Sequence, residues 1–459
     1  MVVGVRRKLA TAGLILIAGA IAACTTLPGG ARVENYKGDE KALFRGIANP
    51  LPEHQPMPPP KVRYIFHIHG MGLTKREDFH DDLFSLLEEK YQLVDKGKDW
   101  MPARLPRAVM VAAEGLDCEK WVDPLDPGAG AIEKPCEFGS FGEFRVDEFR
   151  NARGDERVRL YTYFWHRDLW RIQEPHLRAD MARNKGRPPL LNTFLKRETM
   201  DGGLSDAATY AGPAGALVRA GISSVLCTMA RDAAGLGYEP SAARSLNACG
   251  GSLPASPDVE FSYVTHSLGS RMLFDVLAPP DNAAAAVSAT DARGFLIDRG
   301  RVVFMAANQL PLLALGHVRL SDDPERPDGA AAAIAPAAPN PDSSMLRVLE
   351  AKRRLERPEK DGAPSVDSLR IVAFMDPDDI LGFKASDVHR SQVEFVDVTH
   401  RNIGQFFWLL TMPQWAHDQE VSNGALPRLL GSKTRQMILC GAMIDAKGRV
   451  RPYECRPPV

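Results

Sequence analysis

The chain has 459 residues, of which 44% are hydrophobic and 25% charged, enough apolar material for one large domain with insertions or for two domains. The formal net charge at pH 7 is only −1, and no basic patch stands out along the sequence. Because binding to nucleic acid depends on concentrated positive charge, the composition argues against DNA or RNA as a partner.

The first 23 residues have the pattern of a bacterial leader peptide. Three basic residues at positions 6 to 8 precede an apolar run from 9 to 22, which is too short for a comfortable permanent span. Small residues come directly before Cys24, as in a lipobox, so we expect Cys24 to be lipidated and to anchor the mature chain to the membrane. The alternatives are an uncleaved anchor and a plain signal peptide followed by a chance cysteine.

Residues 24–60 are then expected to form a proline-rich tether between the lipid and the folded domain. The segment has Pro-Leu-Pro at 50–52 and three prolines at 58–60, which favour extended chain over packed structure. A lipid-anchored chain of this kind lies at the bacterial cell envelope, on the periplasmic side, and we favour the outer membrane.

The remaining cysteines favour disulfide bonds, because they are even in number and an exported chain folds in an oxidising compartment. Local pairing is one of several possible connectivities, and buried free thiols are the alternative. The third local pair would staple a C-terminal tail that spans residues 431–459. The three near-neighbour pairs are Cys118 with Cys136, Cys227 with Cys249, and Cys440 with Cys455.

The folded part begins with a short apolar run at 62–68 that ends in a glycine-rich turn, which predicts a buried parallel strand. His67 and His69 alternate along this run, so their side chains point the same way and two imidazoles could share a metal ion. No acidic or histidine cluster nearby completes a ligand set. We therefore favour structural histidines that line a pocket, and we expect neither a metal nor an organic cofactor.

The next part of the chain is longer than a βαβ unit requires. Residues 157–165 predict a strand, and a later helix around 222–229 has an apolar face that would pack on the sheet. We expect cap-like insertions near the mouth of the site at 112–155 and 167–205. These insertions serve either as a lid or substrate-binding cap, or as decoration of the scaffold.

Residues 259–270 predict a strand, a sharp turn and the start of a helix. The strand has aromatic and β-branched residues, and the helix ends before Pro279. Ser267 lies at the turn, where its hydroxyl would project over the end of the sheet, above the positive end of the helix dipole. This environment suits a serine nucleophile, and an ordinary loop that contains a serine is the alternative.

Three further buried strands are predicted at 301–309, 369–375 and 393–398. Strands and helices alternate along the chain, which predicts an α/β fold with a mostly parallel central sheet flanked by helices.

The segment from Thr265 to Gly269 resembles the nucleophile elbow, G-x-S-x-G, of the α/β-hydrolase superfamily, with Ser267 in the place of the nucleophile. It departs from that pattern at Thr265, where a larger side chain replaces the first glycine, so we expect a strained turn. The resemblance spans residues 62 to about 420, and we assign the hydrolase domain to 61–430.

The His-Gly turn after the first predicted strand resembles the oxyanion loop of the same superfamily. There, the residue after His-Gly lends a backbone N–H to the oxyanion hole, and the residue after the nucleophile lends another. The resemblance therefore implies the N–H groups of Met71 and Leu268 as the two donors.

The resemblance also implies an acid and a histidine that follow the nucleophile, in the order serine, acid, histidine. Asp379 fits the acid because an aliphatic pair follows it, and Asp376 is the alternative. His417, in an Ala-His segment followed by a polar turn, is favoured as the base over His400, which lies closer to the end of the last strand. Spacing along the sequence leaves that choice open.

Such a triad implies acyl transfer to water, that is, cleavage of carboxylic esters by an enzyme of the esterase or lipase type. The expected substrate is a small-molecule or lipid ester, and thioesters or amides differ only in the leaving group. A function of another class also stays open, namely a non-catalytic envelope lipoprotein that uses the hydrolase fold as a binding scaffold.

Overall fold

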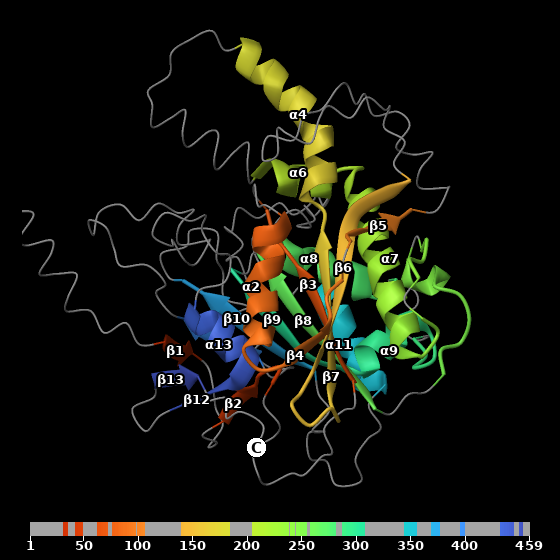
Figure 1. Ribbon diagram of the computed structural model, residues 1–459. Coiled ribbons are helices and arrows are strands. Elements are labelled where there is room, and N and C mark those ends of the chain that lie inside the picture. Colours follow the sequence, from red (N-terminus) through yellow and green to blue (C-terminus); the bar gives the residue numbers. More distant parts are fainter. Residues whose placement is uncertain are drawn as a thin grey trace, which may run out of the picture.

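The structure is a computed structural model whose strands form one 13-stranded mixed sheet, with helices packed on both faces (Figure 1). The described residues are 31–34, 42–48, 62–71, 76–97, 99–105, 139–183, 204–237, 239–243, 245–254, 258–280, 287–307, 344–355, 369–376, 395–399, 432–444 and 449–452.

The centre of the sheet is parallel. Every neighbouring pair in the order β7-β3-β8-β9-β10-β11 runs in the same direction. Strands β3 and β8 are buried along their whole length, as expected of apolar strands covered on both faces. This confirms the predicted α/β class with a mostly parallel sheet flanked by helices. The strands are β3 (Val62–Ile68), β7 (Arg157–Phe164), β8 (Val259–His266), β9 (Gly300–Ala306), β10 (Arg370–Met375) and β11 (Phe395–Thr399).

Antiparallel strands extend the sheet at both edges. Beyond β7 lie β6 and its partners β4 and β5, and beyond β11 the order continues β1-β13-β12-β2. Their bounds are Ala31–Glu34 (β1), Ala42–Arg45 (β2), Gln92–Asp95 (β4), Met101–Arg104 (β5), Ser140–Arg150 (β6), Gly441–Ile444 (β12) and Arg449–Pro452 (β13).

Strands β1 and β2 lie within residues 24–60, where a proline-rich tether outside the folded domain was expected. Strand β1 lies between β11 and β13, and β2 pairs with β12, so strands from the two ends of the described part of the chain form one edge of the sheet. The ring of Phe44 is buried, 6.0 Å from the rings of both Phe304 and Phe374. The prediction was wrong because the partners of these strands come from the other end of the chain. Residues 441–452, expected as part of a tail, supply those partners.

Strand β6 corrects part of the insertion expected at 112–155. It pairs with β7 over eight residue pairs and buries Phe141, Phe144 and Phe149. Its buried positions do not alternate regularly, so the sequence alone carries a weak strand signal, and the pairing with β7 defines it. The preceding residues, 106–138, lie outside the described part of the chain.

The helices divide between the two faces of the sheet. Helices α2 and α13 share a core with Ile65, Val264 and Phe304, and the other helices share a core with Phe66 and Phe261. The helix predicted around 222–229 is confirmed as α7. The helices are α2 (Arg76–Glu88) and α13 (Ser432–Cys440) on one face, and α7 (Gly215–Ala233), α8 (Leu268–Leu277), α9 (Ala292–Asp298) and α11 (Ser344–Leu355) on the other.

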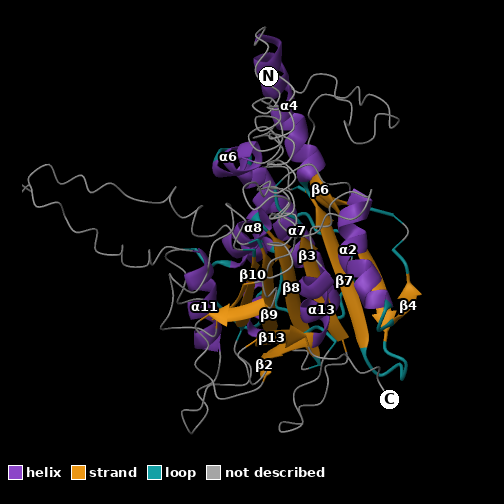
Figure 2. Cartoon of the chain, turned by 90° about the vertical axis from the view of Figure 1, so that its left-hand side faces the viewer, coloured by secondary structure: helices purple, strands orange, loops and turns teal. Residues whose placement is uncertain are grey.

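Helix α4 (His166–Arg183) begins directly after β7 and extends away from the carboxyl ends of the parallel strands, with α6 (Ser205–Ala211) beside its base (Figures 1 and 2). Among the described helices, none is by itself long and apolar enough to cross a membrane. The bent pair α6 and α7, which meet at 85°, passes that test of length and composition only when taken together.

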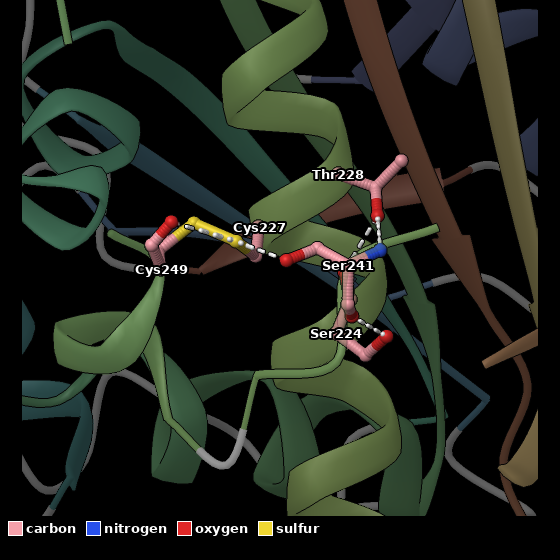
Figure 3. Close-up of a disulfide and its surroundings, with 5 residues drawn as sticks. All are labelled: Ser224, Cys227, Thr228, Ser241 and Cys249. Atoms are coloured by element: carbon pink, nitrogen blue, oxygen red, sulfur yellow. Dashed lines mark hydrogen bonds between the residues drawn. A yellow bond between two sulfur atoms is a disulfide. The ribbon is translucent and has the colours of Figure 1, made fainter. Parts of the chain in front are cut away.

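A disulfide between Cys227 of α7 and Cys249 confirms one of the expected cysteine pairs (Figure 3). The loop between them also lies on α7, because the Ser241 N–H donates to Thr228 Oγ1 at 3.1 Å and the hydroxyl of Ser224 donates to the Ser241 carbonyl. Cys440 is also disulfide-bonded, and its partner lies outside the described residues. Cys118, Cys136 and Cys455 also lie outside them, as does Cys24.

A buried ion network lies at the amino ends of the parallel strands. Arg63 Nε, at the start of β3, lies 2.7 Å from Glu156 Oε1 and 3.2 Å from Glu260 Oε1. Its Nη1 also donates to the carbonyl of Ile47, which ties the segment after β2 to the sheet. Burial acts to lower the pKa of Arg63, but the nearby Glu260 and Glu156 outweigh it and raise that pKa above its ordinary value.

Candidate active site

Ser267 occupies a strained turn between β8 and α8. Its backbone dihedrals are φ 51° and ψ −125°, a region that residues other than glycine rarely adopt and that costs about 1–3 kcal/mol. The Ser267 N–H donates to the Ala306 carbonyl at 2.8 Å, and the Ser270 N–H donates to the Ser267 carbonyl at 3.1 Å. The turn is therefore held by β9 on one side and by the first turn of α8 on the other.

Two glycines let the turn after β3 lie against the turn after β8. A Cβ atom on Gly70 would lie 2.4 Å from Ser267 Cβ and 2.6 Å from the His266 carbonyl oxygen. A Cβ atom on Gly269 would lie 2.5 Å from the His69 carbonyl oxygen. Because both contacts are with rigid atoms, neither position accepts a side chain without backbone movement.

Thr265, the departure from the G-x-S-x-G pattern, is held by hydrogen bonds. Its Oγ1 donates to the Phe304 carbonyl at 3.1 Å and, since a hydroxyl has one proton, accepts from Ser270 Oγ at 2.7 Å. The larger residue thus joins β8 to β9 and to the first turn of α8. The sequence shows the departure, but it gives no sign of this arrangement.

The topology puts these turns at a switch point of the sheet. The chain that leaves β3 continues to the strands on the β7 side, whereas the chain that leaves β8 continues to β9 and β10 on the other side. In open α/β sheets the crevice outside the carboxyl ends of two such adjacent strands is where ligands bind. Ser267, Gly70 and the expected oxyanion residues, Met71 and Leu268, all come from those two turns.

His69 connects the turn after β3 to the start of α4. Its Nδ1 lies 2.8 Å from the Gly70 carbonyl oxygen, which only accepts, so this nitrogen carries the proton. Its Nε2 accepts from the N–H groups of Trp165 at 3.2 Å and His166 at 3.4 Å. Burial, followed by the neighbouring His166, lowers the pKa of His69 well below its ordinary value, so the ring is neutral.

His67 also lies in an apolar setting. Its ring stacks on Phe79 with the centroids 4.0 Å apart, and burial, together with His80 and His266, lowers its pKa well below the ordinary value. The Nδ1 atom of His80, in α2, lies 3.1 Å from Thr162 Oγ1. Burial lowers the pKa of His80 to about 3. Within the described ranges, no group of three or more histidine, cysteine or acidic side chains is arranged to hold a metal ion.

A second strained residue lies next to Ser267. Ala307, directly after β9, has φ 51°, and its N–H donates to the Phe374 carbonyl at 2.9 Å. These two are the positive-φ residues other than glycine in the described part of the chain. Such strain concentrates at functional sites. An alanine carries no local sign of it, so the sequence did not reveal this position.

Asp376, the alternative acid, directly follows β10 at the carboxyl end of that strand, the same end at which Ser267 follows β8. It is 3% exposed. Asp379 and both candidate bases, His417 and His400, lie outside the described residues. The structure thus brings the turns of Ser267, Leu268 and Met71 together and leaves the choice of acid and base open.

The carboxylate of Asp275 connects α8, the helix that follows Ser267, to two neighbouring helices through hydrogen bonds. Asp275 of α8 accepts from the hydroxyl of Tyr210 in α6 at 2.8 Å, from Arg271 Nε at 2.9 Å and from the hydroxyl of Ser344 in α11. Three helices therefore meet at one carboxylate, and α6, which lies beside the base of α4, is fixed to the helix that directly follows the candidate nucleophile. No local pattern in the sequence marks Asp275, because its partners are far apart in the chain.

Comparison with known proteins finds no match to a family model, a curated protein or a solved structure.

Proposed function

We propose that this chain is a serine hydrolase that cleaves carboxylic esters, with Ser267 as the nucleophile. The observation that carries the proposal is the strained turn of Ser267, in which a residue with φ 51° joins a fully buried strand to a helix. This conformation is that of the nucleophile elbow of α/β-hydrolases, where it exposes the serine oxygen above the helix N-terminus. The topological switch between β3 and β8 supports the same assignment.

In the proposed reaction, Ser267 Oγ attacks the ester carbonyl after a histidine removes its proton. The N–H groups of Met71 and Leu268 stabilise the oxyanion of the tetrahedral intermediate, and an aspartate orients the imidazole. We propose His417 as the base and Asp379 as the acid, with His400 and Asp376 as the alternatives. The histidine then protonates the departing alcohol, and water repeats the sequence on the acyl-enzyme.

The proposed setting is the bacterial cell envelope, where lipidation of Cys24 would anchor the chain to the membrane. The leader pattern at residues 1–23 supports this proposal, and no part of it rests on the fold. A Cys24→Ala variant should leave the membrane fraction, and one that stays there would contradict the lipid anchor.

The decisive experiment is reaction of the purified chain with a fluorophosphonate, followed by mass mapping of the modified residue. We expect the probe on Ser267, no labelling in Ser267→Ala, and a loss of ester turnover of about 10⁶-fold in that variant. Ser262→Ala removes a different buried serine, which lies within β8, and serves as the matched control. Labelling elsewhere in the folded protein would contradict the assignment.

The same assay assigns the acid and the base. Replacing the true base by alanine should cost about as much as removing the serine, whereas replacing the acid by asparagine should cost about 10⁴-fold. His417→Ala compared with His400→Ala, and Asp379→Asn compared with Asp376→Asn, therefore separate the alternatives.

The second candidate, a non-catalytic binding scaffold, is favoured by one observation. Ser267 is 0% exposed, so its hydroxyl does not contact solvent in this structure. A folded chain that resists the probe at every concentration would support the scaffold and overturn the hydrolase.

A further inference from the structure

The ring of His69 lies between two parts of the molecule that are 96 residues apart in sequence. On one side, Nδ1 donates to the Gly70 carbonyl in the turn that faces Ser267. On the other side, Nε2 accepts from the N–H groups of Trp165, which directly precedes α4, and of His166, the first residue of α4. The first N–H groups of a helix have no partner within the helix, so the imidazole serves as a cap supplied from another strand.

The side chain of Trp165 makes two further contacts with His69. Its indole ring stacks on the His69 imidazole with the centroids 4.6 Å apart and the planes 6° from parallel. Its Nε1 donates to the His69 carbonyl at 3.2 Å. The backbone and the side chain of His69 thus both accept hydrogen bonds from Trp165, the residue directly before α4, and both residues are buried.

We propose that His69 is a positioning residue that holds the Gly70–Met71 peptide in place for catalysis only while the base of α4 is docked against it. The inference rests on the proposed function, since it assigns to the Met71 N–H the role of an oxyanion donor. Helix α4 extends beyond the carboxyl ends of the strands, so a substrate or surface that moves this helix would act on the oxyanion turn through one side chain (Figure 1).

Histidine suits this position because one rigid ring supplies a donor, an acceptor and a flat face. A protonated ring would lose the acceptor and direct an N–H at two other N–H groups and at the positive end of α4. The charged or titratable groups nearest the ring are His166 of α4, His266 of β8 and His67 of β3, none of which would stabilise a second positive charge. The cap therefore requires the neutral ring with its proton on Nδ1.

The test compares two substitutions. His69→Phe keeps an aromatic face against Trp165 but removes both hydrogen bonds, whereas His69→Gln restores an acceptor toward α4. The first readout is the rate constant for labelling of Ser267 by the fluorophosphonate. The second is amide hydrogen exchange at Trp165 and His166 in the full chain, which reports the cap whether or not the chain is an enzyme.

We expect His69→Phe to slow labelling about 100-fold, because a displacement of about 1 Å in a catalytic group has an effect of that size. Exchange at Trp165 and His166 should rise about tenfold, and His69→Gln should recover most of both losses. The matched control is His80→Phe, which removes another buried imidazole with one side-chain hydrogen bond, and labelling should stay within about threefold of the original rate.

The outcomes separate this inference from the proposed function. If the unmodified chain is labelled and His69→Phe is labelled equally fast, His69 is structural only and the inference is wrong while the hydrolase stands. If exchange at Trp165 and His166 is unchanged in His69→Phe, the cap is wrong. If the unmodified, folded chain is not labelled at Ser267, the proposed function fails and the positioning role fails with it.

Discussion

At the amino ends of the parallel strands a buried arginine is paired with carboxylates, whereas at the carboxyl ends buried neutral imidazoles lie beside strained turns. Arg63 sits between Glu156 and Glu260 at the first end, so each charge has a partner. At the second end, burial lowers the pKa values of His67 and His69, and the backbone is strained at Ser267 and Ala307.

The difference separates a stabilising end of the sheet from a strained one. Paired charges, once buried, resist separation because each would leave the other uncompensated in a medium of low polarity. Neutral imidazoles and strained turns instead reduce stability, and backbone strain of this kind concentrates at functional sites. The sheet therefore has paired charges at its amino end and backbone strain at its carboxyl end.

The largest effect on stability should come from the amino end. Arg63→Met leaves the buried Glu260 and the partly buried Glu156 without their nearest cation, so we expect the free energy of unfolding to fall by about 3–5 kcal/mol. Urea unfolding followed by far-UV circular dichroism measures it.

Arg157→Ala is the matched control at the same end of the sheet. Its side chain is 41% exposed and lies 3.8 Å from Glu148, so its loss should cost less than about 1 kcal/mol. Equal losses for Arg63→Met and Arg157→Ala would remove the contrast between buried and exposed charge on which the comparison rests.

Acid should act mainly on the carboxyl end. Burial lowers the pKa of His67 and His69 well below 6.5 and that of His80 to about 3, whereas the same rings in the unfolded chain bind a proton near 6.5. Unfolding therefore takes up protons as the pH falls below 6.5, and the free energy of unfolding decreases by up to about 1.4 kcal/mol per pH unit for each ring.

Asp147, whose Oδ2 lies 3.5 Å from His80 Nε2, works in the opposite sense. Burial raises its pKa to about 6, so the folded chain keeps a proton that the unfolded chain releases between about pH 4 and pH 6. Urea unfolding at several pH values should show a shallower acid loss in His80→Phe and a steeper one in Asp147→Asn. The same dependence of the unfolding free energy on pH in the unmodified chain, His80→Phe and Asp147→Asn would contradict these opposite contributions of His80 and Asp147.

The smallest effect concerns the strain beside Ser267. Ala307→Gly relieves a positive φ, while Ala306→Gly makes the same chemical change one residue earlier in the extended strand β9. Both lose a methyl group and gain freedom in the unfolded chain, so their difference isolates the strain.

We expect Ala307→Gly to be more stable than Ala306→Gly by about 1–2 kcal/mol. Thermal unfolding of the two variants side by side measures this difference. No difference between them would show that the carboxyl end is not strained at Ala307.

The sequence predicted the elements whose signal is local. Continuous apolar runs identified β3 and β8, a helical apolar face identified α7, and a serine between strand and helix identified the turn at Ser267. It failed for β1, β2 and β6, whose positions depend on partners elsewhere in the chain. The contacts between His69 and Trp165 were not predicted for the same reason, because alternating histidines in the sequence do not reveal which groups their ring nitrogens contact. The identity of the acid and the base stays a prediction.

The pairing of β1 and β2 with β13 and β12 has a consequence for how the chain is made. The edge of the sheet beyond β11 is assembled from the earliest and the latest strands along the described part of the chain. Contacts between strands so far apart in sequence form late and slow the search for the native state. Until residue 452 has been synthesised, β1 and β2 lack these partners, and a chain that stops before residue 441 presents an open edge to its neighbours, which favours aggregation.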